Sequence, residues 1–138
     1  MIIFAANYLA VLVAAISAIV LGFLWYGPFF GKPWMKAMDM SKEDIEKAKK
    51  KGMSQTYVLM SIGAFLKAFV LATLLISLAV ITPAGALTTA FIIWLGFAVP
   101  LIMSDQLWGD KPWNLFVINA SYELVALCVI ALVLTYWS

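Results

Sequence analysis

Four long apolar runs dominate this sequence of 138 residues and constrain its fold more than any other feature. They cover approximately residues 2–26, 55–81, 86–108 and 112–137. A bilayer core about 30 Å thick needs roughly 20 apolar residues per helix, so each run is long enough to cross it. Hydrophobic residues make up 65% of the chain and charged residues only 12%, which leaves no room for a separate soluble domain. The sequence therefore predicts one all-α integral membrane domain, residues 1–138, with four transmembrane helices.

The connection between the first two runs, residues 29–53, is the one strongly charged segment. Ser41 is placed as an N-cap, Glu43 and Asp44 lie in the first turn after it, and lysines gather just before Gly52. Serine is a favoured N-cap, glycine commonly follows a helix end, and this order of charges opposes the helix macrodipole. The segment therefore predicts a short charged helix between the first and second transmembrane helices.

The distribution of lysine predicts the orientation in the membrane. Eight of the nine lysines lie in residues 29–53 and 109–111, and these two connections share one side if all four runs cross. The opposite side, which holds both termini and the turn at residues 82–85, has no lysine. Because cytoplasmic connections are rich in lysine and arginine, we expect a multi-pass protein of a cytoplasmic (inner) membrane with both termini outside.

Two similar segments follow the first and third runs. Residues 31–34 read Gly-Lys-Pro-Trp and residues 110–113 read Asp-Lys-Pro-Trp, and both follow a helix that runs from outside to inside. A true duplication would relate two tandem helical hairpins by a parallel pseudo-two-fold axis along the membrane normal. The alternative is that shared interfacial chemistry produces the same tripeptide twice. The sequence leaves both interpretations open.

Several short segments resemble a known family. Residues 7–10 (Asn-Tyr-Leu-Ala), residues 25–28 (Trp-Tyr-Gly-Pro) and Asn119-Ala120, together with the two Lys-Pro-Trp segments, resemble the bacterial family called domain of unknown function 1761. The likeness covers nearly the whole chain. It implies a small prokaryotic integral membrane protein, and it brings no established activity and no functional residues.

Two opposite charges inside the apolar runs form the sharpest functional clue. At about 1.5 Å per helical residue, Lys67 lies some 18 Å and Glu123 roughly 16 Å from the inner ends of their helices. An unpaired charge near the bilayer centre costs about 3 kcal/mol on insertion scales. We therefore predict that Lys67 and Glu123 face inward and form an ion pair. Its function is either to fix the second helix to the fourth, or to let Glu123 take up a proton or cation with an affinity that Lys67 sets.

Other polar side chains extend this candidate site. Asn119 lies one helical turn from Glu123, and Tyr122 flanks them, so the fourth run carries one polar stripe. Ser104 and Asp105 on the third run lie nearer the inner face of the membrane and extend the candidate site in that direction. Asp105 also fits the role of an ordinary interfacial residue.

Small residues recur at every fourth position of the first run: Ala6, Ala10, Ala14, Ala18 and Gly22. Such a strip lets another helix approach to backbone contact. The partner helix belongs either to the same chain or to a second copy, and we expect a homo-oligomer with a dimer favoured.

Composition excludes several classes of function. Histidine and arginine are absent, and the single cysteine, Cys128, lies inside the fourth run. No catalytic triad, standard metal site or phosphate-binding loop can be assembled, so we expect no catalytic residue, metal, cofactor or nucleic-acid partner. The lipid bilayer is the expected partner. The sequence favours a non-catalytic structural or interaction component; the alternative is a small proton- or cation-coupled transporter or channel for a small solute or ion.

Overall fold

The computed structural model describes residues 2, 5, 7–37, 43, 46, 47, 54–109 and 112–137, and this part of the chain holds helices and no strand. The elements, with η for a π-helical segment, are α1 (Tyr8–Leu24), η1 (Trp25–Phe29), α2 (Gly31–Ala37), α4 (Ser54–Ser77), α5 (Pro83–Ile93), η2 (Trp94–Ala98), α6 (Val99–Gly109) and α7 (Trp113–Trp137). Four continuous helical stretches are long and apolar enough to cross a membrane: Tyr8–Phe29, Tyr57–Ser77, Pro83–Gly109 and Trp113–Trp137. The predicted all-α fold with four candidate spans is confirmed for the described residues.

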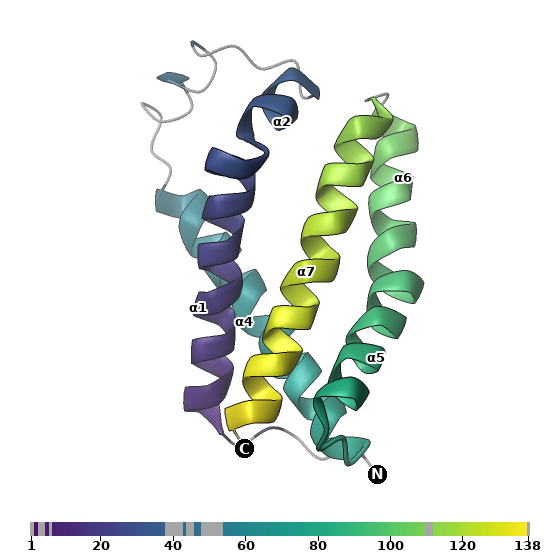
Figure 1. The fold of residues 1–138 in the computed structure, drawn as a ribbon. Coiled ribbons are helices and arrows are strands. Elements are labelled where there is room, and N and C mark those ends of the chain that lie inside the picture. The colour runs from purple at the N-terminus through teal and green to yellow at the C-terminus, as the bar shows by residue number, and fades with distance from the viewer. Residues whose placement is uncertain are drawn as a thin grey trace.

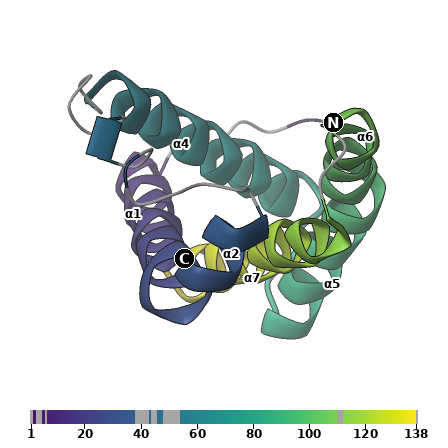
Figure 2. The ribbon, with the colours of Figure 1, turned by 90° about the horizontal axis from the view of Figure 1, so that it is seen from above.

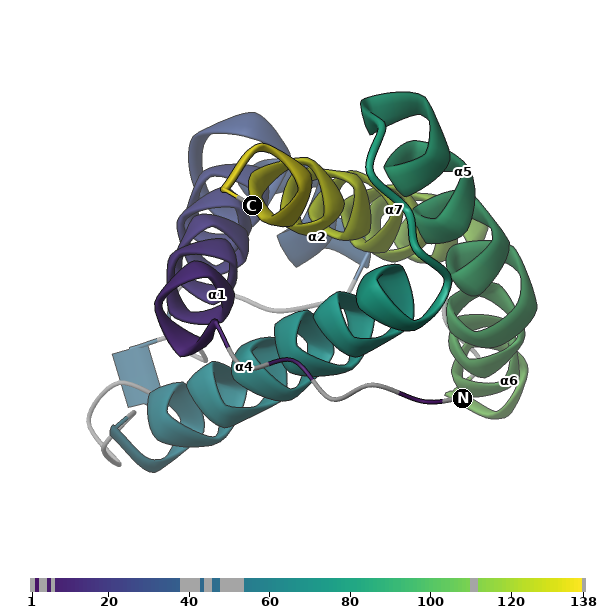
Figure 3. The same ribbon diagram turned by 90° about the horizontal axis from the view of Figure 1, so that it is seen from below.

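The four spans run alternately up and down (Figure 1). The start of α1 and the end of α7 lie at one end of the bundle, which we call the terminal end, and α2 and the start of α7 lie at the other, the loop end. Helix α7 packs against α1 on one side and α5 on the other. Helix α4 crosses the bundle obliquely (Figures 2 and 3). It begins beside α1 and far from α6, and it ends near α5.

The tightest packing involves the small-residue strip of α1. Ala10, Ala14 and Ala18 keep only 3%, 0% and 2% of their surface exposed, against α4 and α7 of the same chain. A Cβ added to Gly22 would lie 3.1 Å from the hydroxyl oxygen of Tyr122 on α7. Ala6 lies outside the described residues. The strip therefore packs within the chain, and its described members are not available as a seam between two copies.

The first helix ends differently from the prediction. Glycine followed by proline, here Gly27 and Pro28, predicts a break in a helix. The backbone instead passes through the π-helical segment η1, and the N–H of Phe30 donates to the Trp25 carbonyl at 2.8 Å. The wider π-helical turn accommodates a proline that has no N–H to donate. A Cβ on Gly31 would lie 2.8 Å from the Tyr26 carbonyl oxygen, so this close turn into α2 requires glycine.

The other helix boundaries have local causes. Asn7 caps α1, because its side-chain oxygen accepts a hydrogen bond from the N–H of Ala10. Thr82 caps α5 in the same way, with Pro83 in the first turn. A proline inside a helix frees a carbonyl about one turn before it, and the π-helical segment η2 lies just before Pro100.

The predicted charged helix between the first two spans lies mostly outside the described residues, Ser41 and Gly52 included. Glu43, Glu46 and Lys47 are described, and they are helical and exposed. The charged helix as a whole stays a prediction.

Candidate functional site

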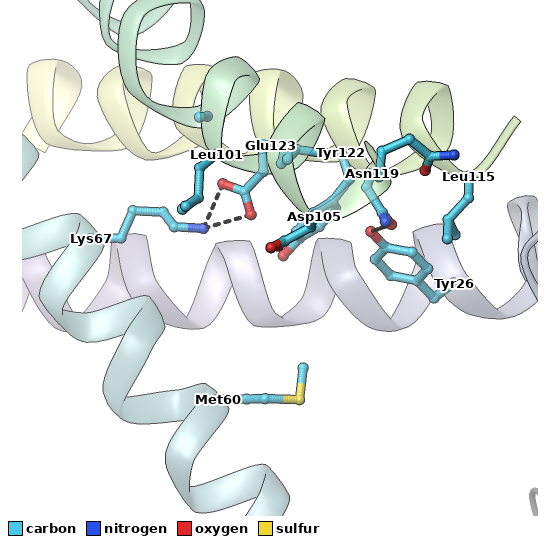
Figure 4. A pocket seen from close by; sticks show the side chains of 12 residues that line it. Tyr26, Met60, Lys67, Leu101, Asp105, Leu115, Asn119, Tyr122 and Glu123 are labelled. Carbon is cyan, nitrogen blue, oxygen red and sulfur yellow. Dashed lines mark hydrogen bonds and ion pairs between the residues drawn. The ribbon is translucent and has the colours of Figure 1, made fainter. Parts of the chain in front are cut away.

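The predicted ion pair joins α4 to α7. The Nζ atom of Lys67 donates to both carboxylate oxygens of Glu123, at 3.1 Å to Oε1 and 2.8 Å to Oε2 (Figure 4). The same Nζ lies 6.0 Å from the centre of the Tyr122 ring, within reach of a cation–π interaction. The Lys67 and Glu123 side chains nevertheless keep 29% and 26% of their surface exposed. The two charges satisfy each other but are not enclosed.

A cavity of about 560 Å³ reaches the pair, and both charged side chains line it. Helix α4 supplies Met60 to one wall and α6 supplies Leu101 to the opposite wall, while α7 forms the floor between them. The cavity lies between α4, α6 and α7. Toward the loop end α4 lies away from α6, so these two helices do not close the space between them (Figure 2). A structural bundle would close such a gap, since helices in membranes associate through close packing.

The floor of the cavity is the predicted polar stripe of α7, joined by one residue that the sequence did not assign to it. Tyr26 of η1 donates its hydroxyl hydrogen to Oδ1 of Asn119 at 2.7 Å. The Tyr122 hydroxyl donates to the Ala18 carbonyl at 3.1 Å, and the Tyr26 and Tyr122 rings lie 5.2 Å apart. In the sequence, the position of Tyr26 at the end of an apolar run is typical of an interfacial aromatic residue. Its contact with Asn119 could not be predicted, because Tyr26 lies in the π-helical segment η1.

The two candidate residues on α6 have different positions. Asp105 lines the cavity, whereas the exposed Ser104 does not, so the structure brings only Asp105 to the polar site. Within the described residues, the Asp105 carboxylate has no hydrogen bond and no salt bridge. The next residue, Gln106, is buried, lines the cavity and donates to the Pro112 carbonyl at 2.8 Å. Asp105 therefore contributes an unpaired carboxylate.

Two tryptophans hold the floor helix in place. The indole N–H of Trp25 donates to the Ile118 carbonyl at 3.2 Å, and that of Trp94 donates to the Ala120 carbonyl at 2.7 Å. Each tryptophan is the first residue of a π-helical segment. These bonds hold α7 on both sides of Asn119. No pattern in the sequence predicted that the two indole groups would bond to α7.

A second, apolar pocket of about 260 Å³ lies on the terminal side of the pair, between α4, α5 and α7. Lys67 lines this pocket as well as the polar cavity. Its aliphatic stem lies along apolar surface while its ammonium group reaches Glu123, as lysine side chains commonly do in membranes. In the described ranges, no group of three or more acidic or cysteine side chains is placed to hold a metal ion.

Four apolar helices with a charged pair inside the bundle are typical of a multi-pass membrane protein. The chain belongs to the family described as protein of unknown function DUF1761, whose model matches residues 9–135. The resemblance seen in the sequence is therefore confirmed. No curated protein and no solved structure matches this chain.

Proposed function

We propose that this protein is a small proton- or cation-coupled transporter whose solute site is the cavity at the Lys67–Glu123 pair. One observation carries the proposal: both charged side chains of the pair line the cavity. Each keeps more than a quarter of its surface exposed. Charges within membrane helices that line a cavity commonly mark the path of an ion or solute.

The structural role favoured by the sequence explains this geometry less well. A pair that only fixes α4 to α7 gains nothing from an open cavity, and well-packed apolar residues often stabilise a fold as well as a buried ion pair does. Helix α4 already packs along α1 through small residues such as Ala68 and Ala72. The pair is therefore not needed to keep α4 in the bundle.

The packing also supports access from one end. On the terminal side, beyond the small apolar pocket beside Lys67, buried residues such as Leu75, Ile130 and Ala131 close the bundle. On the loop side the cavity extends away from the pair and is lined by Met60, Asp105 and Leu115. When Glu123 takes up a proton or cation, its attraction for Lys67 weakens, and α4 becomes free to shift against α7. Such a shift would alternate the access to the site.

The proposal includes an orientation. Lysine-rich connections at the loop end, including the exposed Lys32 and Lys36 of α2, support a cytoplasmic position of that end by the positive-inside rule. The cavity would then lie on the cytoplasmic side of the pair. No chemical step is assigned to the site, so the protein is proposed to be non-catalytic.

The test measures proton flux in liposomes that contain the purified protein and a trapped pH-sensitive dye. An imposed pH gradient, with potassium and valinomycin to carry the balancing charge, should produce faster dye response with wild type than with empty liposomes. The double variant Lys67→Met/Glu123→Gln removes both charges and should reduce the flux to that of empty liposomes while the helix content and the elution volume stay unchanged. Equal flux in wild type and the folded double variant would reject the proposal and favour a structural pair.

A further inference from the structure

We infer that the solute of this cavity is a lipophilic organic cation, a molecule with one positive charge on an apolar body. The inference rests on the proposed function, because it names the solute class of the same site. It is carried by the charges that line the cavity and by the character of the walls around them.

The lining carries an unbalanced negative charge. Two carboxylates, Glu123 and Asp105, face the cavity together with a single ammonium group, that of Lys67. The Lys67 ammonium group donates to both oxygens of Glu123. The Asp105 carboxylate has no such partner among the described residues. A carboxylate in a cavity with low-dielectric walls attracts cations and repels anions, so Asp105 selects the sign of the solute.

The walls favour an organic cation over a hydrated metal ion. Exposed apolar side chains such as Met60 and Leu101 line the cavity beside the carboxylates. Metal cations such as magnesium and calcium require many oxygen ligands, and apolar walls provide none. The cavity volume of about 560 Å³ also falls in the range of sites for small organic ligands.

Aromatic rings supply a second attraction for positive charge. The Tyr122 ring already lies near a cation, the Lys67 ammonium, and the Tyr26 ring packs against it. Ring faces attract quaternary and other poorly hydrated cations most strongly, because these lose little hydration on binding. A cation that enters past Asp105 therefore reaches a site with an aromatic wall and with Glu123 at its inner end.

The test uses radiolabelled tetraphenylphosphonium and the full-length protein held on an affinity resin in detergent, with bare resin as the blank. Wild type should bind the cation saturably. Asp105→Asn, which keeps the size of the side chain, should weaken binding about tenfold, because one nearby opposite charge is lost. Glu46→Gln is the matched control: it removes the same charge from an exposed site outside the cavity, and it should leave binding unchanged.

A second measurement needs no variant. Triphenylphosphine oxide, a neutral molecule of similar shape, should compete at least about tenfold more weakly than unlabelled tetraphenylphosphonium. Equal affinity of wild type and Asp105→Asn, or equal competition by the neutral molecule, would overturn the inference.

The outcome is separable from that of the proposed function. Absence of saturable cation binding, together with proton flux that depends on the Lys67–Glu123 pair, would overturn this inference and leave the transporter standing. Absence of both would overturn both.

Discussion

The terminal half and the loop half of this bundle are built on different principles. In the terminal half, alanines of α1, α4 and α5 are fully buried and the helices approach closely around Leu127 and Ile130. In the loop half, α4 lies away from α6, and tyrosines and charged groups face a cavity. The same four helices therefore form a closed core at one end and an open site at the other.

The difference teaches that side-chain size sets the degree of closure in a membrane bundle. Lipid tails are as apolar as leucine, so helices associate by packing rather than by leaving water. Small residues allow that packing, as at Ala86 and Ala90, which are fully buried. Where the helix faces carry Met60 or Leu101 instead, the helices stay apart and a polar site has room. The Lys67–Glu123 pair lies at the boundary between the closed terminal half and the open loop half.

The largest effect should come from breaking the pair on one side only. Lys67→Met leaves the Glu123 carboxylate without its ammonium partner inside the membrane, and we expect a loss of about 3 kcal/mol in the free energy of unfolding. This value lies at the low end for buried pairs, because the two side chains keep 29% and 26% of their surface exposed. Titration with sodium dodecyl sulfate in mixed micelles measures the change.

The double variant Lys67→Met/Glu123→Gln is the control for this prediction. It leaves no unpaired charge, so most of the lost stability should return. If Lys67→Met alone is as stable as wild type, then the loop half is wet enough to solvate a free carboxylate, and the boundary between the halves lies deeper than the pair.

The ion pair shows what one-dimensional counting can predict in a membrane protein. Helix rise fixes depth, topology fixes direction, and two charges at one depth inside lipid have to meet. The stripe of Asn119, Tyr122 and Glu123 followed from helical spacing in the same way. These predictions needed no knowledge of how the helices pack.

The cavity itself was beyond such counting, because it depends on the tilt of α4 and on the rotation of each helix about its axis. Asp105 lines the cavity whereas its neighbour Ser104 does not. Only the packing of α6 against α7 decides between them. The contact of Tyr26 with Asn119 was unpredictable for a related reason: Tyr26 lies in a π-helical segment, whereas Pro28 in the sequence indicates a helix break.

A matched pair of substitutions on α4 measures the contrast between the halves directly. Ala72→Leu places leucine at a position only 5% exposed in the closed half, and overpacking there should cost about 2 kcal/mol. Met60→Leu places the same residue at the exposed wall of the cavity and should change stability by less than about 0.5 kcal/mol. The same detergent titration compares them.

Equal losses from the two leucines would mean that the loop half is also filled, by lipid or by another helix in the membrane. A loss at Met60 alone would reverse the assignment of the closed and open halves. Helix content by circular dichroism separates both outcomes from simple misfolding.

A smaller loss than at Ala72 is expected where the alanine strip meets the cavity. Gly22→Ala would place a Cβ 3.1 Å from the Tyr122 hydroxyl oxygen, closer than an ordinary contact. The ring would have to shift, which strains its hydrogen bond to the Ala18 carbonyl, and we expect a loss of about 1 kcal/mol. In a Tyr122→Phe background the obstructing oxygen is gone, so the same substitution should be neutral. A double-mutant cycle on unfolding free energies measures this coupling. Equal losses from Gly22→Ala in both backgrounds would show that Tyr122 does not lie against Gly22, and that the closed strip ends before it reaches the cavity wall.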